Sequence, residues 1–600
     1  MAEYTNPNQQ GGGGMDSRSL MFTVVVFLVV FFGMQYFLPK KSAPEQPQQA
    51  TQNNQQSAPA AVAASAAPEA TQAAVNAKTV VAPAEAQTVI ENELYKITFT
   101  NRGAQVTSWI LKKYKDHDGQ PLDLVHSDTA AKFGYPLSLY TYDADLTSKL
   151  KQPLYVVSAG GAVSSASGTL SAPATLSFHY ADGLGLEVQK TFSFDQTYVV
   201  HVDTLVTQNG SPVRSLVSWP IGPNAIQAGR SGMGFKFSST TASSEQFDVM
   251  QDSKATHTAA AKVSGGKTQD GPFDWAGVSD LYFGSVFLPD NPQTATVVSI
   301  VNPVDVVIND KKTVSMAVLG AAIGDTSGRT QTSLYVGPKV LELLKNVHGT
   351  AGNAPSLEKL IDFGWFGPIS KFLFLSLYFV EKITGNWGWA IILLTVIINV
   401  LLLPLRISTM KSALKMQRIQ PQMDQIKAKY AKYKLTDPKH QEKNAEVMKL
   451  QKDNGVNVLG GCIPNLIQMP LLIAFITMLP KVTELRLLHW GWLPDLTAPD
   501  PWHILPILVI VTSFLAQYYM PSPGVDPQQQ KMMAFMMPAF FGFFFWSYAS
   551  GPCLYYATSN AIMLTQQVVM NRTSLGREMR EIAAKRARRK AGTGVIQGKR

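Results

Sequence analysis

The sequence predicts a membrane protein with six spanning helices and a large all-β domain outside the membrane. Charged residues make up 16% of the 600 residues and hydrophobic residues 46%, whereas soluble domains carry roughly 25% charged residues. Long uncharged apolar runs occur in one N-terminal segment and in the C-terminal part. The region between them alternates polar and apolar residues in short runs, which is typical of strands. A wholly soluble enzyme is therefore excluded.

Cysteine content and charge narrow the function classes further. The two cysteines, Cys462 and Cys553, lie in apolar runs, so a disulfide-stapled scaffold is excluded and no Cys/His metal spacing is present. We expect no metal and no cofactor. A net charge of +10 is compatible with nucleic acid, an anionic membrane surface or loops that set membrane topology.

The N-terminal part predicts a membrane anchor on a flexible linker. Residues 1–19 are polar and glycine-rich, and residues 20–38 form an uncharged run long enough to cross a bilayer core of roughly 30 Å. A cleavable signal peptide would be shorter and would end in a small-residue cleavage site. Pro39-Lys40-Lys41 follows instead, which favours an uncleaved anchor. The Ala, Pro and Gln composition of residues 39–87 predicts a flexible linker.

Residues 88–347 predict a large β-sandwich. Runs such as Tyr95–Thr100 and Thr175–Tyr180 alternate apolar and polar residues, and no periodic helical stretch suggests βαβ units. The turn signals are Asp118-Gly119, Asp182-Gly183 and Asn209-Gly210.

Enzymatic signals in this region are weak. Gly265-Gly266-Lys267-Thr268 resembles the end of a phosphate-binding loop, but the required first glycine would fall at Ala261. Five scattered histidines without ligand spacing are interpreted as structural, namely His117, His126, His179, His201 and His257.

The C-terminal part predicts an interfacial helix and five further spans. Residues 355–385 carry Lys371, Glu381 and Lys382 around an aromatic body, which is typical of an amphipathic helix on a membrane surface. The expected spans are 387–405, 458–479, 504–520, 532–548 and 552–570. The third and fourth of these are short, and local thinning of the bilayer would accommodate them.

Loop charge predicts the orientation. Residues 406–455 contain twelve Lys or Arg and the tail 571–600 contains ten, whereas residues 481–503 contain only Lys481 and Arg486. The positive-inside rule places 406–455 and the tail in the cytoplasm. Counting back, the N-terminus is also cytoplasmic and the β-domain lies outside.

Residues 406–455 predict a cytoplasmic helical hairpin. Pro438 marks the hinge, and Met416, Ile419, Met423 and Ile426 recur at helical spacing on the first arm. Its basic charge has two interpretations. It sets topology and contacts anionic headgroups, or it docks an acidic partner such as ribosomal RNA or a targeting factor.

Polar residues inside the spans are the candidate functional residues, because each is costly in hydrocarbon. Thr395, Asn399 and Arg406 follow at i, i+4 and i+11, so Asn399 and Arg406 share a helix face about 10 Å apart. Together with Asn465, Gln468 and a polar band on the last span, they predict a chamber open to the cytoplasm. The alternative is interhelical hydrogen bonding by the same residue types. The band contains Tyr556, Ser559, Asn560, Gln566 and Gln567.

Four motifs in the C-terminal part are long and specific. They are Asn386-Trp-Gly-Trp389, Gly455–Pro470, Asp526–Lys531 and Leu554–Asn560 with Gln566-Gln567. Together they closely resemble the Gram-negative branch of the YidC/Oxa/Alb family of membrane protein insertases. The resemblance covers residues 20–590, and Leu334–Lys339 with the β-region matches the family's periplasmic domain more loosely.

The resemblance implies an inner-membrane insertase and chaperone rather than an enzyme. The five C-terminal helices would form the insertase core, with a hydrophilic groove open to cytoplasm and lipid and no nucleotide or metal. The β-region would be a supersandwich of the sugar-mutarotase type. Implied partners are nascent membrane proteins, the ribosome, signal-recognition machinery, the Sec translocon and membrane lipid.

Site residues follow from the motifs and from the polar pattern. The expected groove residues are Thr395, Asn399, Arg406, Asn465, Gln468, Tyr556, Asn560 and Gln567. The expected docking cations of the hairpin are Lys411, Lys415, Arg418, Lys427 and Lys429.

The sequence departs from the family's pattern at one groove position. The family usually has an arginine four residues after the threonine that corresponds to Thr395, where this chain has Asn399. We hypothesise that Arg406, on the same helix face, supplies part of the missing positive charge. The alternative is that Arg406 only extends to the lipid headgroups.

Two other function classes are weighed against an insertase. A small-molecule transporter would need repeat symmetry and intramembrane ionisable residues, and no Asp or Glu lies in the middle of a span. A membrane-anchored sugar-binding or sugar-processing protein would use the β-domain. Deletion of most of residues 88–340 would abolish the activity of such a protein and spare an insertase core.

Overall fold

The computed structural model describes residues 79–597 with internal gaps. The predicted anchor at 20–38 and the linker residues 39–78 lie outside the described residues. The gaps are residues 117, 161, 165–167, 224–244, 310–311, 350–353, 365, 431–432, 434–437, 457–462 and 520–526.

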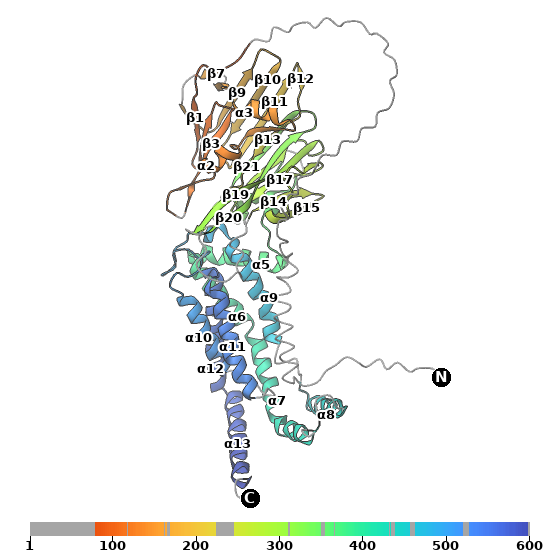
Figure 1. The fold of residues 1–600 in the computed structure, drawn as a ribbon. Coiled ribbons are helices and arrows are strands. Elements are labelled where there is room, and N and C mark those ends of the chain that lie inside the picture. Colours follow the sequence, from red (N-terminus) through yellow and green to blue (C-terminus); the bar gives the residue numbers. More distant parts are fainter. Residues whose placement is uncertain are drawn as a thin grey trace, which may run out of the picture.

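The described part of residues 79–347, here called the β-domain, forms three sheets (Figure 1). In spatial order the first sheet is β4 (Pro121–Asp123), β3 (Gln105–Lys115), β2 (Tyr95–Thr100), β1 (Gln87–Glu91) and β8 (Gly168–Ser171). The second is β15 (Lys254–Ala259), β14 (Gln246–Gln251), β17 (Trp275–Ser279), β18 (Phe283–Pro289), β21 (Arg329–Pro338), β11 (Val199–Gln208), β10 (Leu186–Phe194), β9 (Ala174–Ala181), β6 (Val156–Ala159) and β7 (Ala162–Ser164), with β12 (Ser211–Pro212) beside β11. The third is β16 (Thr268–Asp270), β19 (Ala295–Asn309), β20 (Lys312–Asp325), β13 (Ser215–Trp219) and β5 (Ser138–Thr141).

The strand pattern read from the sequence is confirmed locally. In β2, Tyr95, Ile97 and Phe99 are fully buried and alternate with more exposed residues, as a pleated strand on a core requires. At the predicted Asn209-Gly210 turn, Gln208 pairs with Ser211, so the loop has two residues, and φ is 51° and 78°. Positive φ at both central residues is the geometry that Asn-Gly favours in a tight hairpin.

Aromatic side chains fill the space between the sheets. Trp109 of β3 and Trp219 of β13 meet edge to face with ring centroids 5.5 Å apart, and both are fully buried. The strand pairs described are antiparallel apart from the parallel pair β1–β8. The domain also contains short helices that the all-β prediction lacked, namely α2 (Ser127–Phe133), α3 (Ala144–Lys151), η2 (Ala260–Lys262) and α4 (Leu341–Lys345).

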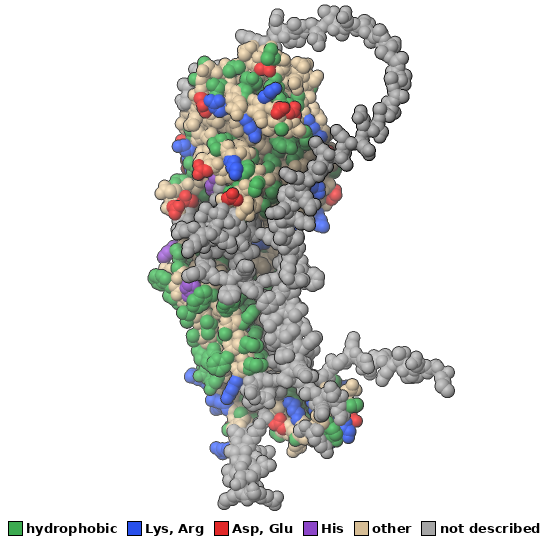
Figure 2. All heavy atoms as spheres, viewed as in Figure 1, with side chains coloured by type: hydrophobic (Ala, Val, Ile, Leu, Met, Phe, Trp, Pro, Cys, Tyr) green, Lys and Arg blue, Asp and Glu red, His purple; other side chains and the backbone are tan. Residues whose placement is uncertain are grey.

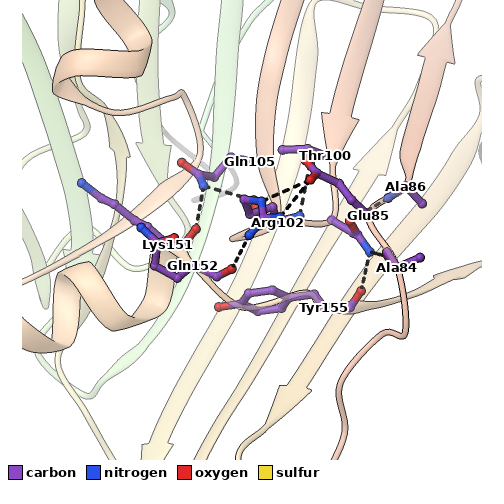
Figure 3. Close-up of polar contacts among 10 residues, drawn as sticks. Ala84, Glu85, Ala86, Thr100, Arg102, Gln105, Lys151, Gln152 and Tyr155 are labelled. Atoms are coloured by element: carbon purple, nitrogen blue, oxygen red, sulfur yellow. Dashed lines mark hydrogen bonds and ion pairs between the residues drawn. The ribbon is translucent and has the colours of Figure 1, made fainter.

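The β-domain begins before residue 88, which corrects the predicted linker boundary. Val80 exchanges two 2.9 Å backbone hydrogen bonds with Ala181 of β9. Figure 3 shows the next residues held by the turn between β2 and β3, where Arg102 pairs with Glu85 at 2.9 Å. Asn101 both accepts from the Ala86 amide and donates to a backbone carbonyl of the same segment. Satisfied backbone groups, which composition does not reveal, make residues 79–86 part of the fold.

A sharp corner connects the β-domain side to the helical region. Helix α5 (Gly367–Thr384) follows η3 (Leu357–Leu360) and ends at Gly385, whose φ of 63° reverses the chain. Asn386 then caps α6 (Trp387–Leu401) by accepting from the amides of Gly388 and Trp389. The two helices meet at 118°. Residues 355–366, expected to be part of the amphipathic helix, lie outside α5.

The helical region places its helices close to the predicted ranges. The predicted span 387–405 is divided, because the chain breaks at Leu402 and a new helix starts before Pro404, which has no amide to donate. The remaining helices are α7 (Leu403–Lys429), α8 (Lys439–Asp453), α9 (Ile463–Met478), η5 (Leu479–Lys481), η6 (Thr483–Leu485), α10 (Ile504–Tyr519), α11 (Pro527–Trp546), α12 (Ser550–Arg572) and α13 (Ser574–Gln597).

No individual helix in the described part of the chain is both long and apolar enough to cross a membrane, whereas the bent pair α5 and α6 meets that criterion jointly. The face of the helical region seen in Figure 2 carries many hydrophobic side chains, and Lys and Arg lie toward its end away from the β-domain. The exposed hydrophobic residues of α10 and α11 include Ile507, Val511, Phe535 and Phe543.

The C-terminal tail, predicted only as basic, forms a helix on the hairpin. Met579 of α13 is buried against Met410 and Leu414 of α7. Arg418 of α7 forms an ion pair with Glu578 of α13. The tail is therefore part of the packed structure up to that contact, and α13 continues away from it (Figure 1).

Gly388 provides a test of packing at the start of α6. A Cβ atom at this position would lie 2.2 Å from Cδ1 of Trp490, closer than any real contact. We expect Gly388→Ala to lower the free energy of unfolding by about 1–3 kcal/mol through overpacking. Thermal unfolding of the full chain in detergent, followed by helical circular dichroism, measures this. Gly367→Ala is the control, because its Cβ would lie 3.8 Å from the nearest side-chain atom. Equal midpoints for the two variants would contradict the prediction.

Candidate functional site

Helices α6 and α7 bring three of the predicted groove residues together. Thr395 and Asn399 are fully buried on α6. The Thr395 hydroxyl donates to the Ile391 carbonyl at 2.6 Å, and the Asn399 amide donates to the Thr395 carbonyl at 2.8 Å. Arg406, in the first turns of α7, extends back along the same face, and its Nη2 donates to Oδ1 of Asn399 at 3.1 Å. The hydrogen bond between Arg406 and Asn399 therefore crosses the break between α6 and α7 at Leu402.

Helix α12 completes the site. Arg406 Nη1 donates to Oε1 of Gln566 at 2.9 Å, and Nε2 of Gln566 donates to the backbone carbonyl of Asn399 at 3.2 Å. The Asn399 amide also reaches Oγ of Ser559 at 3.4 Å. Asn399 of α6 therefore pairs with Ser559, and Arg406, seven residues later at the start of α7, pairs with Gln566, seven residues later on α12. Equal offsets in the same order mean that α6 and α12 run parallel.

Helix α9 joins the same network through Gln468. Its Nε2 donates to Oγ of Ser559 at 3.2 Å and to the hydroxyl of Tyr555 at 3.1 Å. The Tyr555 ring is fully buried and stacks on Phe475 of α9 with centroids 4.0 Å apart. We call Thr395, Asn399, Arg406, Gln468, Tyr555, Ser559 and Gln566 the polar network.

A second polar contact lies on the neighbouring face of α12. Asn560 is buried and donates to Oγ of Ser513 on α10 at 2.7 Å. The Tyr556 ring lies between Phe541 and Phe545 of α11, with centroids 5.0 Å and 5.4 Å away. Tyr556 and Asn560 thus face α10 and α11, away from Arg406.

Besides Tyr556 and Asn560, two further predicted residues are not placed in the polar network. Gln567 hydrogen-bonds Asn571 on its own helix at 2.9 Å. The side chain of Asn465 lies outside the described residues. Gln566, the neighbour of Gln567, belongs to the polar network. The spacing of polar residues along the last span indicates this position. Tyr555, Ser559 and Gln566 repeat the i, i+4, i+11 spacing of Thr395, Asn399 and Arg406. Ser513 on α10 had no such signal.

The polar network contains one positive charge, that of Arg406, whose hydrogen-bond partners are neutral. The hydrogen-bond partners that the structure gives the Arg406 guanidinium are two amide oxygens, and both are neutral. Arg406 is itself only partly exposed. A guanidinium in such a place carries a positive charge that its neighbours do not compensate. The site can therefore attract a carboxylate and offers amide and hydroxyl groups to a polar backbone.

The hairpin is formed as predicted, with some of its cations in internal contacts. Met416, Ile419, Met423 and Ile426 of α7 pack on Val447 and Leu450 of α8, and Pro438 immediately precedes α8. Lys429 pairs with Glu446 across the hairpin at 3.2 Å, and Arg418 pairs with Glu578. Lys415 lies 3.5 Å from the carbonyl of Gly455. Lys411 and Lys427 are exposed.

Three described histidines of the β-domain contact polar side chains. Nδ1 of His257 contacts Asp248 at 2.7 Å, His179 contacts Glu187 at 2.9 Å, and His201 contacts Ser333 at 2.8 Å. Burial lowers the pKa of His126, and His117 lies outside the described residues. Among the described residues, His, Cys, Asp and Glu form no group that could hold a metal ion. Thr268 begins strand β16, so the glycine-rich run is not a phosphate loop.

Comparison with known proteins covers both parts of the chain. Residues 87–376 match the family model described as the YidC periplasmic domain, and residues 379–577 match the model described as the 60Kd inner membrane protein. A solved YidC insertase with its first transmembrane domain resolved aligns with 83% of this chain and 96% of its own at 17% identity, with a TM-score of 0.33.

Curated relatives cover most of the chain. The membrane protein insertase YidC of Ralstonia nicotianae is 31% identical over 84% of this chain and 86% of its own length. The protein of the same name from Geobacter sulfurreducens is 32% identical over 80% of this chain and 85% of its own. Sequence identity above 30% over most of the chain establishes which family it belongs to. The chain belongs to the YidC family of membrane protein insertases, with a periplasmic β-rich domain followed by a helical C-terminal region.

Proposed function

We propose that this protein inserts nascent membrane proteins into the inner membrane and helps them to fold. The observation that carries the proposal is the polar network, in which the positive charge of Arg406 contacts the neutral side-chain amides of Asn399 and Gln566. A polar segment crossing hydrocarbon leaves backbone groups unpaired at a cost of several kcal/mol each. Groups that can exchange their internal hydrogen bonds for bonds to the passing segment lower that barrier.

The proposed topology has six spans with both termini in the cytoplasm. The spans are 20–38, 387–405, 458–479, 504–520, 532–548 and 552–570. Five C-terminal spans that begin outside make the second and sixth spans run in the same direction. The parallel pairing of α6 and α12 supports this arrangement. The network then lies toward the cytoplasmic end of the bundle, in the position expected for a groove that receives substrate.

The proposed partners follow from the charges of the cytoplasmic side. Lys411 and Lys427 are exposed on the first arm of the hairpin and are the cations we assign to docking. They would meet the ribosome, the signal-recognition machinery or anionic lipid. Arg418 and Lys429, already in ion pairs, would take part only after exchanging their carboxylate partners. Use of the Sec translocon is proposed as a second mode of the same activity.

Site-specific photocrosslinking tests the proposed function. A photoreactive residue replaces Asn399, and in a second protein it replaces Ile397, which is 40% exposed on another face of α6. A short single-span membrane protein is then translated on ribosomes beside membranes that contain each variant. We expect crosslinks to the nascent chain from position 399 and not from position 397. Correctly assembled protein that gives no crosslink from 399 would contradict the proposed function.

A further inference from the structure

Residues 479–487, here called the junction segment, fasten the helical region to the β-domain. The hydroxyl of Thr483 reaches the backbone carbonyls of Tyr282 and Lys339, each at 3.3 Å. Nη1 of Arg486 donates to the carbonyl of Lys115 at the end of β3 at 2.6 Å. These bonds join residues that are more than one hundred positions apart in the chain. The junction segment therefore contributes several directional contacts between the two parts.

Glu484 lies inside this segment and is an exception to the usual pairing of buried charge. Its Oε1 atom is buried and has no hydrogen-bond partner among the described residues. Buried carboxylates are normally paired or hydrogen-bonded, because desolvation penalises the charged form. Glu342 of α4 and Glu381 of α5 are the carboxylates that act on it. Burial, followed by the charges of these two residues, raises the pKa of Glu484 to about 7.

The cations around Glu484 are bonded to other groups. Lys382 lies 3.6 Å from Glu342, and Lys481 donates to the carbonyl of Asp362 at 2.9 Å. Nζ of Lys339 donates to the carbonyl of Asp280 at 2.9 Å and to Oγ of Ser279 at 3.2 Å. Two tyrosines, Tyr378 of α5 and Tyr114 of β3, complete the titratable groups that interact with Glu484. Arg486 is already bonded to the Lys115 carbonyl and lies over the rings of Tyr282 and Phe283.

The space beside Glu484 is too small to admit an additional charged partner. A void of about 10 Å³ is lined by Glu484, Lys339, Asp362 and Lys481 together with apolar side chains. That volume is at the lower limit for a single water molecule and cannot hold a hydrated ion. An ionised Glu484 would therefore stay poorly solvated.

We propose that Glu484 is a proton-dependent latch between the β-domain and the helical region. With a proton bound, the carboxyl is neutral, and burying it costs less than burying the charged form. Without the proton, Glu484 is negatively charged while its buried Oε1 atom has no hydrogen-bond partner among the described residues, and the charges of Glu342 and Glu381 repel it, so that the junction segment loosens.

The pH range follows from the direction of the shift. An acidic group whose pKa is raised in the folded state stabilises that state fully below its ordinary pKa of 4.5. The stabilisation is lost as the pH rises through about 7. The junction is therefore closed in mild acid and opens toward alkaline pH. This inference concerns the connection between the two parts and does not depend on the insertase activity.

Hydrogen exchange of the full-length chain in lipid nanodiscs tests the latch. Exchange is compared at about pH 5.5 and about pH 8.5, with labelling times scaled for the intrinsic amide rate. We expect exchange in residues 479–487 to rise on the order of tenfold beyond the intrinsic change. Glu484→Gln should remain at the slow rate at both pH values. A flat wild-type response, or a Glu484→Gln variant that follows the wild type, would overturn the proposal.

Two further variants guard against an ambiguous result. Glu381→Gln removes one of the like charges without touching the junction segment, and it should move the midpoint to lower pH because the pKa of Glu484 falls. An unchanged midpoint would overturn the like-charge mechanism even where Glu484→Gln does not fold. Glu187→Gln, an exposed carboxylate on β10, is the matched control and should leave the response unchanged.

Discussion

Replacing Lys190 with Met is expected to lower the free energy of unfolding of the β-domain by about 3–5 kcal/mol. The Lys190 side chain is fully buried on β10. Its Nζ donates to the carbonyls of Ala104 at 2.5 Å, Leu137 at 2.6 Å and Gly103 at 3.3 Å. Methionine fills the space of the aliphatic stem but leaves three buried carbonyl groups without a donor.

The measurement is thermal unfolding of the full chain in detergent, followed by the β-sheet signal in circular dichroism. A loss of this size in a domain of this length corresponds to a midpoint shift on the order of 10 °C. Lys96→Met is the matched control, because Lys96 lies on the exposed face of β2. Similar unfolding midpoints for Lys190→Met and Lys96→Met would show that the hydrogen bonds from the Lys190 amine to the three carbonyl groups do not stabilise the β-domain.

Arg406→Gln is expected to reduce insertion of substrates with acidic residues in the translocated segment by ten- to a hundredfold. A hydrogen bond to a charged group contributes about 1.5–3 kcal/mol, which sets this range. Glutamine keeps hydrogen-bonding capacity toward Asn399 and Gln566, the two partners of the guanidinium. The variant therefore tests the charge rather than the polar network. Protease protection of the translocated segment in proteoliposomes is the readout.

Matched substrates and variants separate charge from structure. A substrate with a neutral translocated segment should be affected less by Arg406→Gln than an acidic one. Lys411→Gln, at an exposed position on the same helix, should leave both unchanged. The exchange variant, Asn399→Arg with Arg406→Gln, returns the cation to the position where the family usually carries it and should restore insertion. Equal insertion of acidic and neutral substrates by Arg406→Gln would refute electrostatic compensation by Arg406.

Local sequence patterns predicted much of the fold. Alternation placed Tyr95, Ile97 and Phe99 in one buried face of a strand, and Asn209-Gly210 formed a two-residue turn. Helical periodicity on the first arm of the hairpin identified residues that pack on α8. Each of these patterns arises from the geometry of a few neighbouring residues, so no knowledge of distant contacts was needed.

The candidate site was predicted in part. The shared face of Thr395, Asn399 and Arg406 followed from the helical repeat, and the hydrogen bond between Asn399 and Arg406 agrees with it. The polar band on the last span contained both Gln566 and Gln567, and in the structure Gln566 contacts α6 whereas Gln567 contacts Asn571 of its own helix, because adjacent residues point about 100° apart. The roles of these residues in insertion stay predictions.

The sequence by itself determined the periodic elements, the division into a β-domain and a helical region, and the residue types available for a polar site. Only the tertiary structure decided which faces meet. It placed α12 parallel to α6, packed α13 on α7, added residues 79–86 to the β-domain and buried the Oε1 atom of Glu484 without a hydrogen-bond partner among the described residues. The physical reason is that burial and hydrogen-bond pairing between distant segments depend on the whole arrangement, whereas strand alternation and helical repeat depend on neighbours alone.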